Sequence, residues 1–211
     1  MITVESVSKR LRGVEVISDA SAHFEAGRAY AIVGPNGAGK SVLLRLMCRL
    51  MRPTSGSVSF DAAIAPPGTT YPQSTGVSID GPAYVPTLSG MANLRELARI
   101  RDLIGDAEIA DWMRRLGLDP ALPTKVRNYS LGMKQKLALT QALMEEPRVL
   151  LLDEPLNALD ESSAQSVKSL LREHVDAGGL LVFTSHERRD VDELADVVLR
   201  LDAGRLVPEA A

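Results

Sequence analysis

The chain has 211 residues, of which 45% are hydrophobic and 24% are charged, and its formal net charge is −3. These values predict one domain with a sizeable core, and they argue against a broad, positively charged surface that binds nucleic acid. A single cysteine, Cys48, excludes an intrachain disulfide, and no apolar run reaches the roughly 20 residues of a spanning helix. We expect a cytoplasmic chain that meets a membrane only through a partner.

The N-terminal part of the sequence predicts strands and one helix. Residues 2–11 and 15–24 alternate between apolar and polar side chains, with a turn between them. RAYAIVG, residues 28–34, is a short apolar run and predicts a buried strand. A helix begins after Gly39, and residues 56–61 predict another strand. The expected apolar face of that helix consists of Leu43, Leu44, Leu46, Met47 and Leu50.

The middle of the chain changes character. Residues 61–87 are rich in proline and glycine, which predicts loops with short strands. Amphipathic patterns then predict a helix over 91–104 with Ser89 as its N-cap, and a second helix over 107–116 with Asp106 as its N-cap and Gly117 as its C-cap. A third helix is expected over about 131–145.

Strands and helices alternate again towards the C-terminus. RVLLLDEP (148–155) and GLLVFTS (179–185) are apolar runs that predict buried strands, and each is followed by a helical pattern, over 162–175 and 187–195. A terminal hairpin is expected across Ala203 and Gly204. This order predicts an α/β fold with a mainly parallel sheet and an antiparallel β subdomain at the N-terminus. We expect one domain over 1–211, with a core of about 1–78 and 146–211 and an inserted helical subdomain of about 79–145.

GPNGAGKS, residues 34–41, matches the phosphate-loop pattern G-x-x-x-x-G-K-[ST] between a predicted strand and a predicted helix. In such a loop the backbone N–H groups wrap a phosphate, Lys40 reaches the β- and γ-phosphates, and Ser41 offers a hydroxyl to Mg²⁺. A glycine-rich turn is the alternative, but the flanking strand and helix favour a P-loop NTPase core.

Asp153 and Glu154 stand at the end of the apolar run RVLLL. Open α/β sheets bind their ligands at the carboxyl ends of their strands, so both side chains are expected beside the phosphate loop. Asp153 is predicted to hold Mg²⁺, and Glu154 is predicted to polarise the water that attacks the γ-phosphate. Without the phosphate loop, a solvated turn would be the better interpretation of this pair.

NYSLGMKQKL, residues 128–137, leads from a polar turn into a helix. Ser130 and Gly132 lie at the start of that helix, where unpaired N–H groups favour an anion. From these ten residues alone, an ordinary serine-capped helix is the simpler interpretation.

GPNGAGKS, YSLGMKQKL, VLLLDEPLNALD and TSHE, in this order, resemble the ATPase subunit of ATP-binding-cassette (ABC) transporters over essentially the whole chain. The resemblance implies ATP and Mg²⁺ as cofactors and two ATPase domains that meet head to tail around two ATP molecules. It implies that His186 contacts the γ-phosphate and that Asp160 lies in a loop along the dimer interface. The signature residues, which would bind the ATP of the partner, are Ser130, Leu131, Gly132 and Met133.

The resemblance also implies the residues that bind the subunit's own nucleotide. An aromatic side chain usually stacks on the adenine, but Leu11 stands at that position here, supported by Val16. We therefore expect weaker or less base-selective binding. The residues expected to contact the phosphates are Asn36, Gly37, Ala38, Gly39, Lys40, Ser41 and Val42.

Two further positions depart from the family pattern. Asp80 occupies the position of the glutamine that usually touches Mg²⁺ and the attacking water, and Gln73 is the alternative, seven residues earlier. Met133 replaces the usual glutamine of the signature. Some exporters of the bacitracin- and lantibiotic-resistance type carry an acidic residue at the position of Asp80, and YSLGMKQ is also their form of the signature, so the resemblance is to that type.

The predicted function is ATP hydrolysis that energises a separate membrane permease, through a contact over residues 80–104. Export is predicted from the signature, whereas the cargo and the identity of the second ATPase, a copy of this chain or a different cassette, stay open. The alternative is an ABC-type ATPase that acts as a non-transport switch in cell-envelope assembly. A small P-loop kinase would leave YSLGMKQ and the TSHE histidine unexplained.

Overall fold

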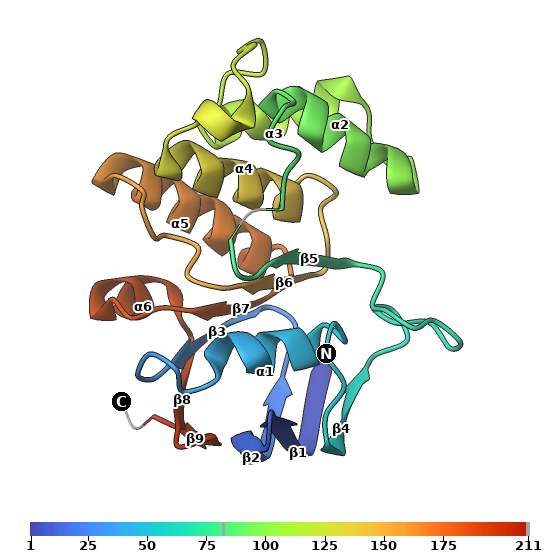
Figure 1. Cartoon of the computed structure of the whole chain (residues 1–211), viewed down its shortest axis with the longest axis vertical. Helices are drawn as coiled ribbons and strands as arrows, with labels where there is room; N and C mark the ends of the chain where they lie inside the picture. Colours follow the sequence, from blue (N-terminus) through green and yellow to red (C-terminus); the bar gives the residue numbers. More distant parts are fainter. Residues whose placement is uncertain (82, 210–211) are drawn as a thin grey trace.

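The apolar runs of the sequence become the strands of one six-stranded sheet, seen at the centre of the computed structural model (Figure 1). Neighbouring strands run parallel except for the last, which returns antiparallel to the strand before it. The predicted mainly parallel sheet and the terminal hairpin are both confirmed. The strand order is β5 (Thr75–Ser78), β6 (Val149–Leu152), β7 (Leu180–Thr184), β3 (Arg28–Val33), β8 (Val197–Asp202) and β9 (Arg205–Pro208).

The structure describes residues 1–81 and 83–209; Pro82, which falls in the predicted loop region 61–87, lies outside the described residues. A second sheet is antiparallel, in the order β2 (Val14–Phe24), β1 (Ile2–Leu11) and β4 (Ser55–Phe60), which confirms the predicted N-terminal β subdomain. Helix α1 (Lys40–Met47) lies between the two sheets and buries its apolar side chains there. The expectation for Leu50 is wrong, because the helix ends at Met47 and Leu50 is 63% exposed.

Three helices cover the other face of the large sheet: α4 (Leu131–Leu143), α5 (Glu161–Asp176) and α6 (Arg188–Leu194). Alternate residues of β3 serve the two faces, since Ala29 and Ala31 pack towards these helices whereas Tyr30 and Ile32 pack towards α1. Helices α2 (Gly90–Arg101) and α3 (Asp106–Arg115) form an outer layer on α4, and a short 3₁₀ turn, η1 (Val126–Asn128), leads into α4.

Two helix boundaries differ from the prediction. Helix α2 ends at Arg101 rather than at residue 104, because Asp102 takes a left-handed backbone with φ 53°. Helix α3 is capped by Gly105 rather than by Asp106: the Glu108 carboxylate accepts from the Gly105 N–H at 3.0 Å. Asp106 lies in the first turn and binds Arg95 instead. Among the described helices, none combines the length and the apolarity needed to cross a membrane.

Candidate nucleotide site

Strands β3, β5, β6 and β7 all point their carboxyl ends at one edge of the large sheet. The segments that leave them carry the residues singled out in the sequence: the loop 34–41 after β3, Asp80 after β5, Asp153 and Glu154 after β6, and His186 after β7. Parallel strands bind ligands at this edge, so the fold collects segments from distant parts of the chain into one place.

The loop 34–41 is built around glycine at its junction with α1. Gly39 has φ +102°, and a Cβ atom there would lie 2.9 Å from Val16 Cγ1, so a side chain would be strained and would also clash with β2. The next residue, Lys40, is 7% exposed. Its ammonium donates to the backbone carbonyls of Gly34 at 2.8 Å and of Pro35 at 3.2 Å. The loop therefore holds its cation at the start of a helix, where the helix dipole also favours an anion.

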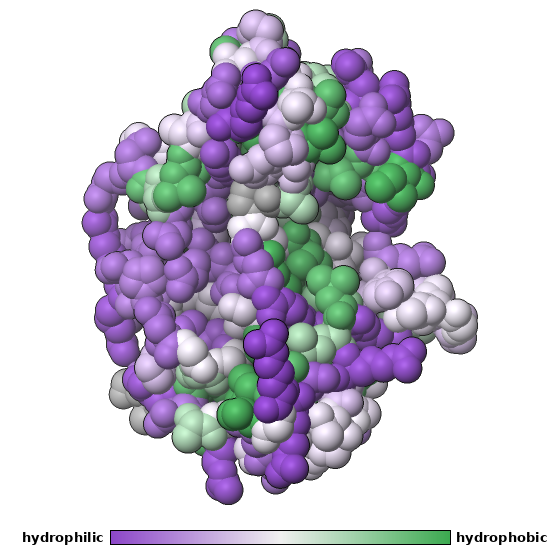
Figure 2. Space-filling view, viewed as in Figure 1, coloured by the Kyte–Doolittle hydropathy of each residue, from purple (hydrophilic) through white to green (hydrophobic). Residues whose placement is uncertain are grey.

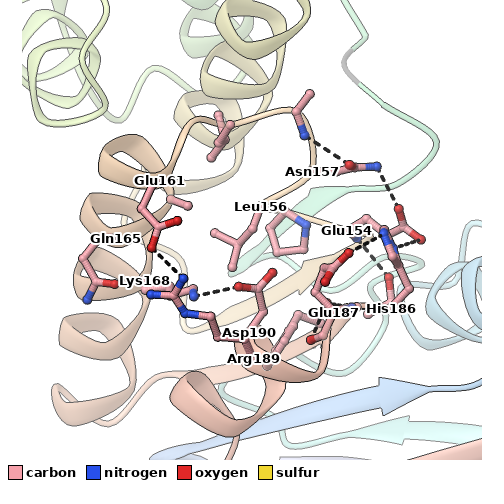
Figure 3. A pocket seen from close by; sticks show the side chains of 17 residues that line it. Glu154, Leu156, Asn157, Glu161, Gln165, Lys168, His186, Glu187, Arg189 and Asp190 are labelled. Carbon is pink, nitrogen blue, oxygen red and sulfur yellow. Dashed lines mark hydrogen bonds and ion pairs between the residues drawn. The ribbon is translucent and has the colours of Figure 1, made fainter.

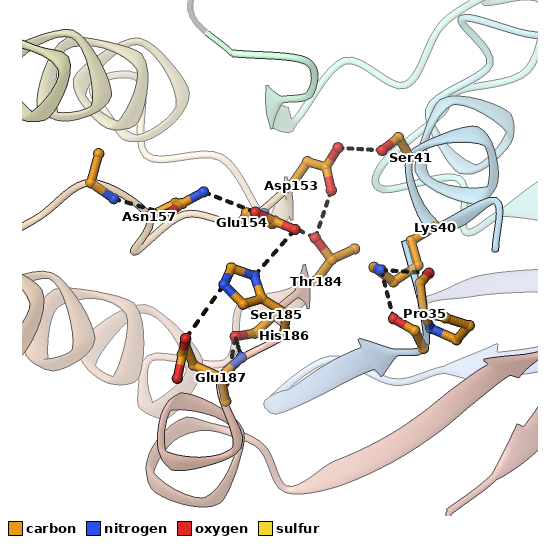
Figure 4. A network of polar contacts seen from close by, with 12 residues as sticks. Pro35, Lys40, Ser41, Asp153, Glu154, Asn157, Thr184, Ser185, His186 and Glu187 are labelled. Atoms are coloured by element: carbon orange, nitrogen blue, oxygen red, sulfur yellow. Dashed lines mark hydrogen bonds and ion pairs between the residues drawn. The ribbon is translucent and has the colours of Figure 1, made fainter. Parts of the chain in front are cut away.

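Ser41, Asp153 and Thr184 form a chain of short hydrogen bonds (Figure 4). Ser41 Oγ donates to Asp153 Oδ2 at 2.5 Å, and Thr184 Oγ1 donates to Asp153 Oδ1 at 2.6 Å. The same Thr184 hydroxyl accepts from the Glu154 N–H at 2.9 Å. These bonds join the start of α1 to the ends of β6 and β7 and present a hydroxyl and a carboxylate side by side.

Glu154 lies between two polar partners (Figure 4). Its Oε1 is 3.4 Å from His186 Nδ1, and its Oε2 accepts from Asn157 Nδ2 at 3.0 Å. Its backbone is left-handed, with φ 48°, which is unfavourable for a residue with a side chain and requires support from its surroundings. Gln135 of α4 gives that support, because its side-chain amide donates to the carbonyls of Glu154 at 3.3 Å and Pro155 at 2.9 Å.

Most of these groups line an open cleft of about 520 Å³, although His186 and Thr184 are not among its lining residues. Most of the predicted nucleotide residues line it, but Leu11 and Ala38 are not among its lining residues, and neither is Gln73, whereas Asp80 is. The full set is Val16, Asn36, Gly37, Gly39, Lys40, Ser41, Val42, Arg45, Asp80, Gly81, Gln135, Asp153, Glu154 and Asn157.

The signature residues lie elsewhere. None of Ser130 to Met133 lines this cleft. The Ser130 hydroxyl caps α4 by accepting from the Met133 N–H at 3.2 Å, as predicted, while Leu131 is 70% exposed. A Cβ atom on Gly132 would lie 2.9 Å from the carbonyl oxygen of Ala158, so the signature and the loop before Asp160 are in contact within one chain.

Asp160 is turned onto its own helix. Its carboxylate accepts from the Ser162 hydroxyl at 2.7 Å and from the Ser163 N–H at 2.8 Å, which makes it the N-cap of α5. The hydrogen bonds from Ser162 and Ser163 lower the pKa of Asp160 to about 2. The carboxylate is therefore ionised at neutral pH and exposed, while its interface role stays a prediction.

A second, smaller cavity of about 260 Å³ lies beside Glu154 and His186, between α5 and α6 (Figure 3). Lys168 spans it, with its ammonium 2.6 Å from Asp190 Oδ1, and Arg189 lies 2.6 Å from Glu161 Oε1. These pairs join the helix that follows the Asp160 loop to the helix that follows His186. The charged side chains of these two pairs bind one another. We therefore interpret the cavity as structural support for the site rather than as a binding site for a charged ligand.

Five described residues in or beside the cleft were not predicted from the sequence: Arg45, Gly81, Gln135, Asn157 and Thr184. Thr184 is fully buried at the end of β7 and lies two residues before His186. The sequence feature that could have pointed to Thr184 is a hydroxyl side chain at the end of a predicted buried strand. No local pattern distinguished Gln135 or Arg45 from other polar residues on helix surfaces, because their contacts are with segments far away in the sequence.

Comparison with known proteins identifies the family. A family model described as ABC transporter matches residues 17–157. The uncharacterized ABC transporter ATP-binding protein YybJ of Bacillus subtilis (strain 168) is 36% identical over 98% of this chain and 94% of its own length. The bacitracin transport ATP-binding protein BcrA of Enterococcus faecalis is 31% identical over 99% of this chain and 68% of its own length.

A solved structure has the same fold. The ATP-binding cassette MJ0796, described as a dimer in a post-hydrolysis state bound to ADP and Pi, superposes with a TM-score of 0.87, 21% sequence identity, and coverage of 100% of this chain and 98% of that one. The predicted fold class and the resemblance to bacitracin-type proteins are thereby confirmed. The chain belongs to the family of ABC transporter ATP-binding proteins and is an ABC-type ATPase.

Proposed function

We propose that this ATPase uses Mg²⁺ and ATP to drive a membrane exporter. One observation supports the assignment of the reaction to this cleft: Lys40 and Ser41, at the start of α1, and Asp153 and Glu154, after β6, line it together. The similarity to BcrA, which is named for bacitracin transport, supports a transport role, and the signature form YSLGMKQ supports export. The alternative, a switch in cell-envelope assembly, would use the same cleft without a transported cargo.

The roles follow from the geometry. Lys40 would exchange the carbonyls of Gly34 and Pro35 for the β- and γ-phosphates. Ser41 and Asp153 are hard oxygen donors that lie side by side, and Mg²⁺ prefers ligands of this kind. When bound, Mg²⁺ would neutralise charge on the phosphate oxygens.

Glu154 is placed as the base for the attacking water. The carboxylate is half-buried, it has an imidazole at 3.4 Å, and its side chain is 30% exposed towards the cleft region, so water can reach it. His186 would orient that water and the γ-phosphate. Asp80 is the second acidic group of the cleft and would act on the metal through a bridging water, because an aspartate is shorter than the usual glutamine.

A second ATPase subunit would complete the site. The signature N-terminus at Ser130 and Gly132 does not line the chain's own cleft, and Leu131 beside it is 70% exposed. An exposed helix N-terminus binds an anion only when a partner brings one. We infer a head-to-tail dimer in which Ser130–Met133 close over the partner's ATP and Asp160 faces the partner's phosphate loop.

The permease would bind near helix α2. Three large apolar side chains are exposed here: Leu97 (38%) and Ile100 (77%) of this helix, and Leu103 (58%), two residues beyond its end. Figure 2 shows hydrophobic side chains gathered over the region where Figure 1 draws α2. Such clusters mark interaction surfaces. This patch lies in the predicted contact region 80–104, so the protein would sit on the cytoplasmic face of the membrane through the permease, with residues 79–145 moving as a subdomain on the core.

Two experiments test this proposal. Purified wild-type protein should hydrolyse ATP only with Mg²⁺ present, and Glu154→Gln should bind ATP with little hydrolysis; equal hydrolysis by both proteins would refute the role of Glu154. In cells, the wild-type protein should sediment with membranes, and Ile100→Asp should move it to the supernatant. A wild-type protein found only in the supernatant would favour the switch over the exporter.

A further inference from the structure

An ion pair at the edge of the cleft joins α1 to the connection between β5 and α2. Arg45 Nη2 donates to Asp80 Oδ2. Arg45 lies one helical turn beyond Ser41, and Asp80 lies two residues beyond the end of β5. Both side chains line the cleft that also holds Lys40 and Asp153. The pair therefore links the helix that carries the phosphate loop to the segment that leads into the helical layer.

The backbone at Asp80 is unfavourable by itself. Asp80 has φ +63° and Gly81 has φ +84°, so two successive residues occupy the left-handed region. Aspartate tolerates that conformation better than most residues with a side chain, but the turn still gains stability from contacts that hold it. The hydrogen bond from Arg45 reaches the chain at this turn, so loss of Arg45 should loosen it.

The other end of the connection is fixed to the helices. Gln141 of α4 donates to the Ala83 carbonyl at 2.9 Å. Asn93 of α2, which is 4% exposed, accepts from the Val85 N–H at 2.6 Å, and its amide donates to the Val85 carbonyl at 3.2 Å. Residues 83–85 therefore move with the helical layer, while Asp80 is held by the core through Arg45.

Nucleotide binding would act on both partners of this pair. Arg45 faces the cleft as a cation, so incoming phosphates attract it, and Asp80 faces the cleft as an anion, so a divalent cation attracts it. Resting on the function proposed above, we propose that the Arg45–Asp80 pair is a latch that holds the helical layer to the nucleotide-free core, and that Arg45 competes with the bound cation for Asp80. Arg45 is in this sense a positioning residue.

Hydrogen exchange without nucleotide tests the latch. Arg45→Ala and Asp80→Ala should each speed exchange of the Asp153 amide, which donates to the Ser78 carbonyl at 2.7 Å two residues before Asp80, by up to about fivefold, since an ion pair of this exposure contributes little more. The double variant should show no further increase, and Arg45→Lys should restore most of the protection. The matched control is Arg95→Ala, which breaks the exposed Arg95–Asp106 pair and should leave this amide unchanged. Unchanged exchange in Arg45→Ala, or an additive double variant, would overturn the latch.

Mn²⁺ binding tests the competition. With a non-hydrolysable ATP analogue bound, Arg45→Ala should tighten Mn²⁺ binding several-fold, measured by the loss of the free Mn²⁺ signal in electron paramagnetic resonance. In the Asp80→Asn background the same change should have a clearly smaller effect. An equal effect in both backgrounds would show that Arg45 acts only as a general positive charge. If the analogue does not bind to the wild-type protein, the proposed function fails, whereas the exchange experiment still reports on the latch.

Discussion

Ser41 and Asp153 lie 112 positions apart in the sequence and share a hydrogen bond of 2.5 Å between Ser41 Oγ and Asp153 Oδ2. This bond joins the first turn of α1 to the end of β6. The two segments expected to hold the metal therefore lie side by side, so metal binding should require little rearrangement at this edge of the sheet.

Replacement of Ser41 should expose its role at the metal. Ser41→Ala removes the hydroxyl and should raise the Mg²⁺ concentration for half-maximal ATP hydrolysis at least about tenfold. Ser41→Thr keeps the hydroxyl and should behave like the wild-type protein. A Mg²⁺ titration of the ATPase rate measures both, and an unchanged Mg²⁺ requirement in Ser41→Ala would remove this residue from the metal site.

Thr184→Val should destabilise the fold and slow the reaction. Thr184 is fully buried, and its hydroxyl satisfies both Asp153 Oδ1 and the Glu154 N–H. The valine leaves both groups without this partner, which should cost about 1–3 kcal/mol of the free energy of unfolding. Urea denaturation measures the loss. Thr184→Ser keeps the hydroxyl, is the control and should retain most of the stability; a Thr184→Val protein as stable as the wild type would contradict the prediction.

Asp80→Ala and Gln73→Ala test which residue takes the position of the glutamine that usually touches Mg²⁺ and the attacking water. Asp80 lines the cleft, whereas Gln73 is exposed and its N–H donates to the Ile64 carbonyl at 2.8 Å. We expect a large loss of ATP hydrolysis from the Asp80 change and little loss from the Gln73 change. Steady-state rates at saturating ATP decide between them, and the opposite order would reassign the position to Gln73.

Gly132→Ala should weaken dimerisation without unfolding the chain. The new Cβ would lie 2.9 Å from the Ala158 carbonyl oxygen, so the loop before Asp160 has to shift. Gly105→Ala is the matched control, because the nearest atom to its new Cβ is Glu108 Oε2 at 3.5 Å. In a Glu154→Gln background, ATP-dependent dimerisation followed by light scattering should decrease only for Gly132→Ala. Equal dimer formation by both variants would show that a shift of the loop at Ala158 does not affect the interface.

His174 should make stability depend on pH. Burial lowers the pKa of His174 in the folded protein below its ordinary value of 6.5. The unfolded chain therefore takes up this proton first as the pH falls, so the contribution is fully present above about pH 6.5 and is lost as the pH drops towards the folded-state pKa. His174→Gln should flatten the fall in Tm over this range, with His23→Gln as the control. An identical pH slope in His174→Gln and wild type would contradict the prediction.

Local patterns in the sequence were sufficient for much of the fold. The strands β6 and β7 are continuous apolar runs, and the loop 34–41 lies between a strand and a helix as its motif requires. Ser89 and Ser130 cap their helices through their own hydroxyls, with partners only three residues away. In each case the contact that determines the structure is close in sequence.

The remaining features depend on contacts between distant residues. Arg45 and Asp80 are 35 positions apart, and Gln135 and Pro155 are 20 positions apart. A local sequence pattern does not show that such distant residues meet, because the fold of the whole chain brings them together. The end of α2 at Arg101 depends on a left-handed Asp102, which competes with a helical pattern that continues to residue 104. Leu11 matches the adenine position by motif spacing, but the cleft as formed is lined by Val16 instead.

We expect Ser130–Met133 to act on the ATP of a second subunit. The most direct test is the mass of Glu154→Gln in solution with and without ATP. The proposal predicts a shift from monomer to dimer when ATP is added, and loss of that shift when Ser130→Arg blocks the helix N-terminus. A protein that binds ATP and stays monomeric would contradict self-pairing and require a different cassette to complete the site.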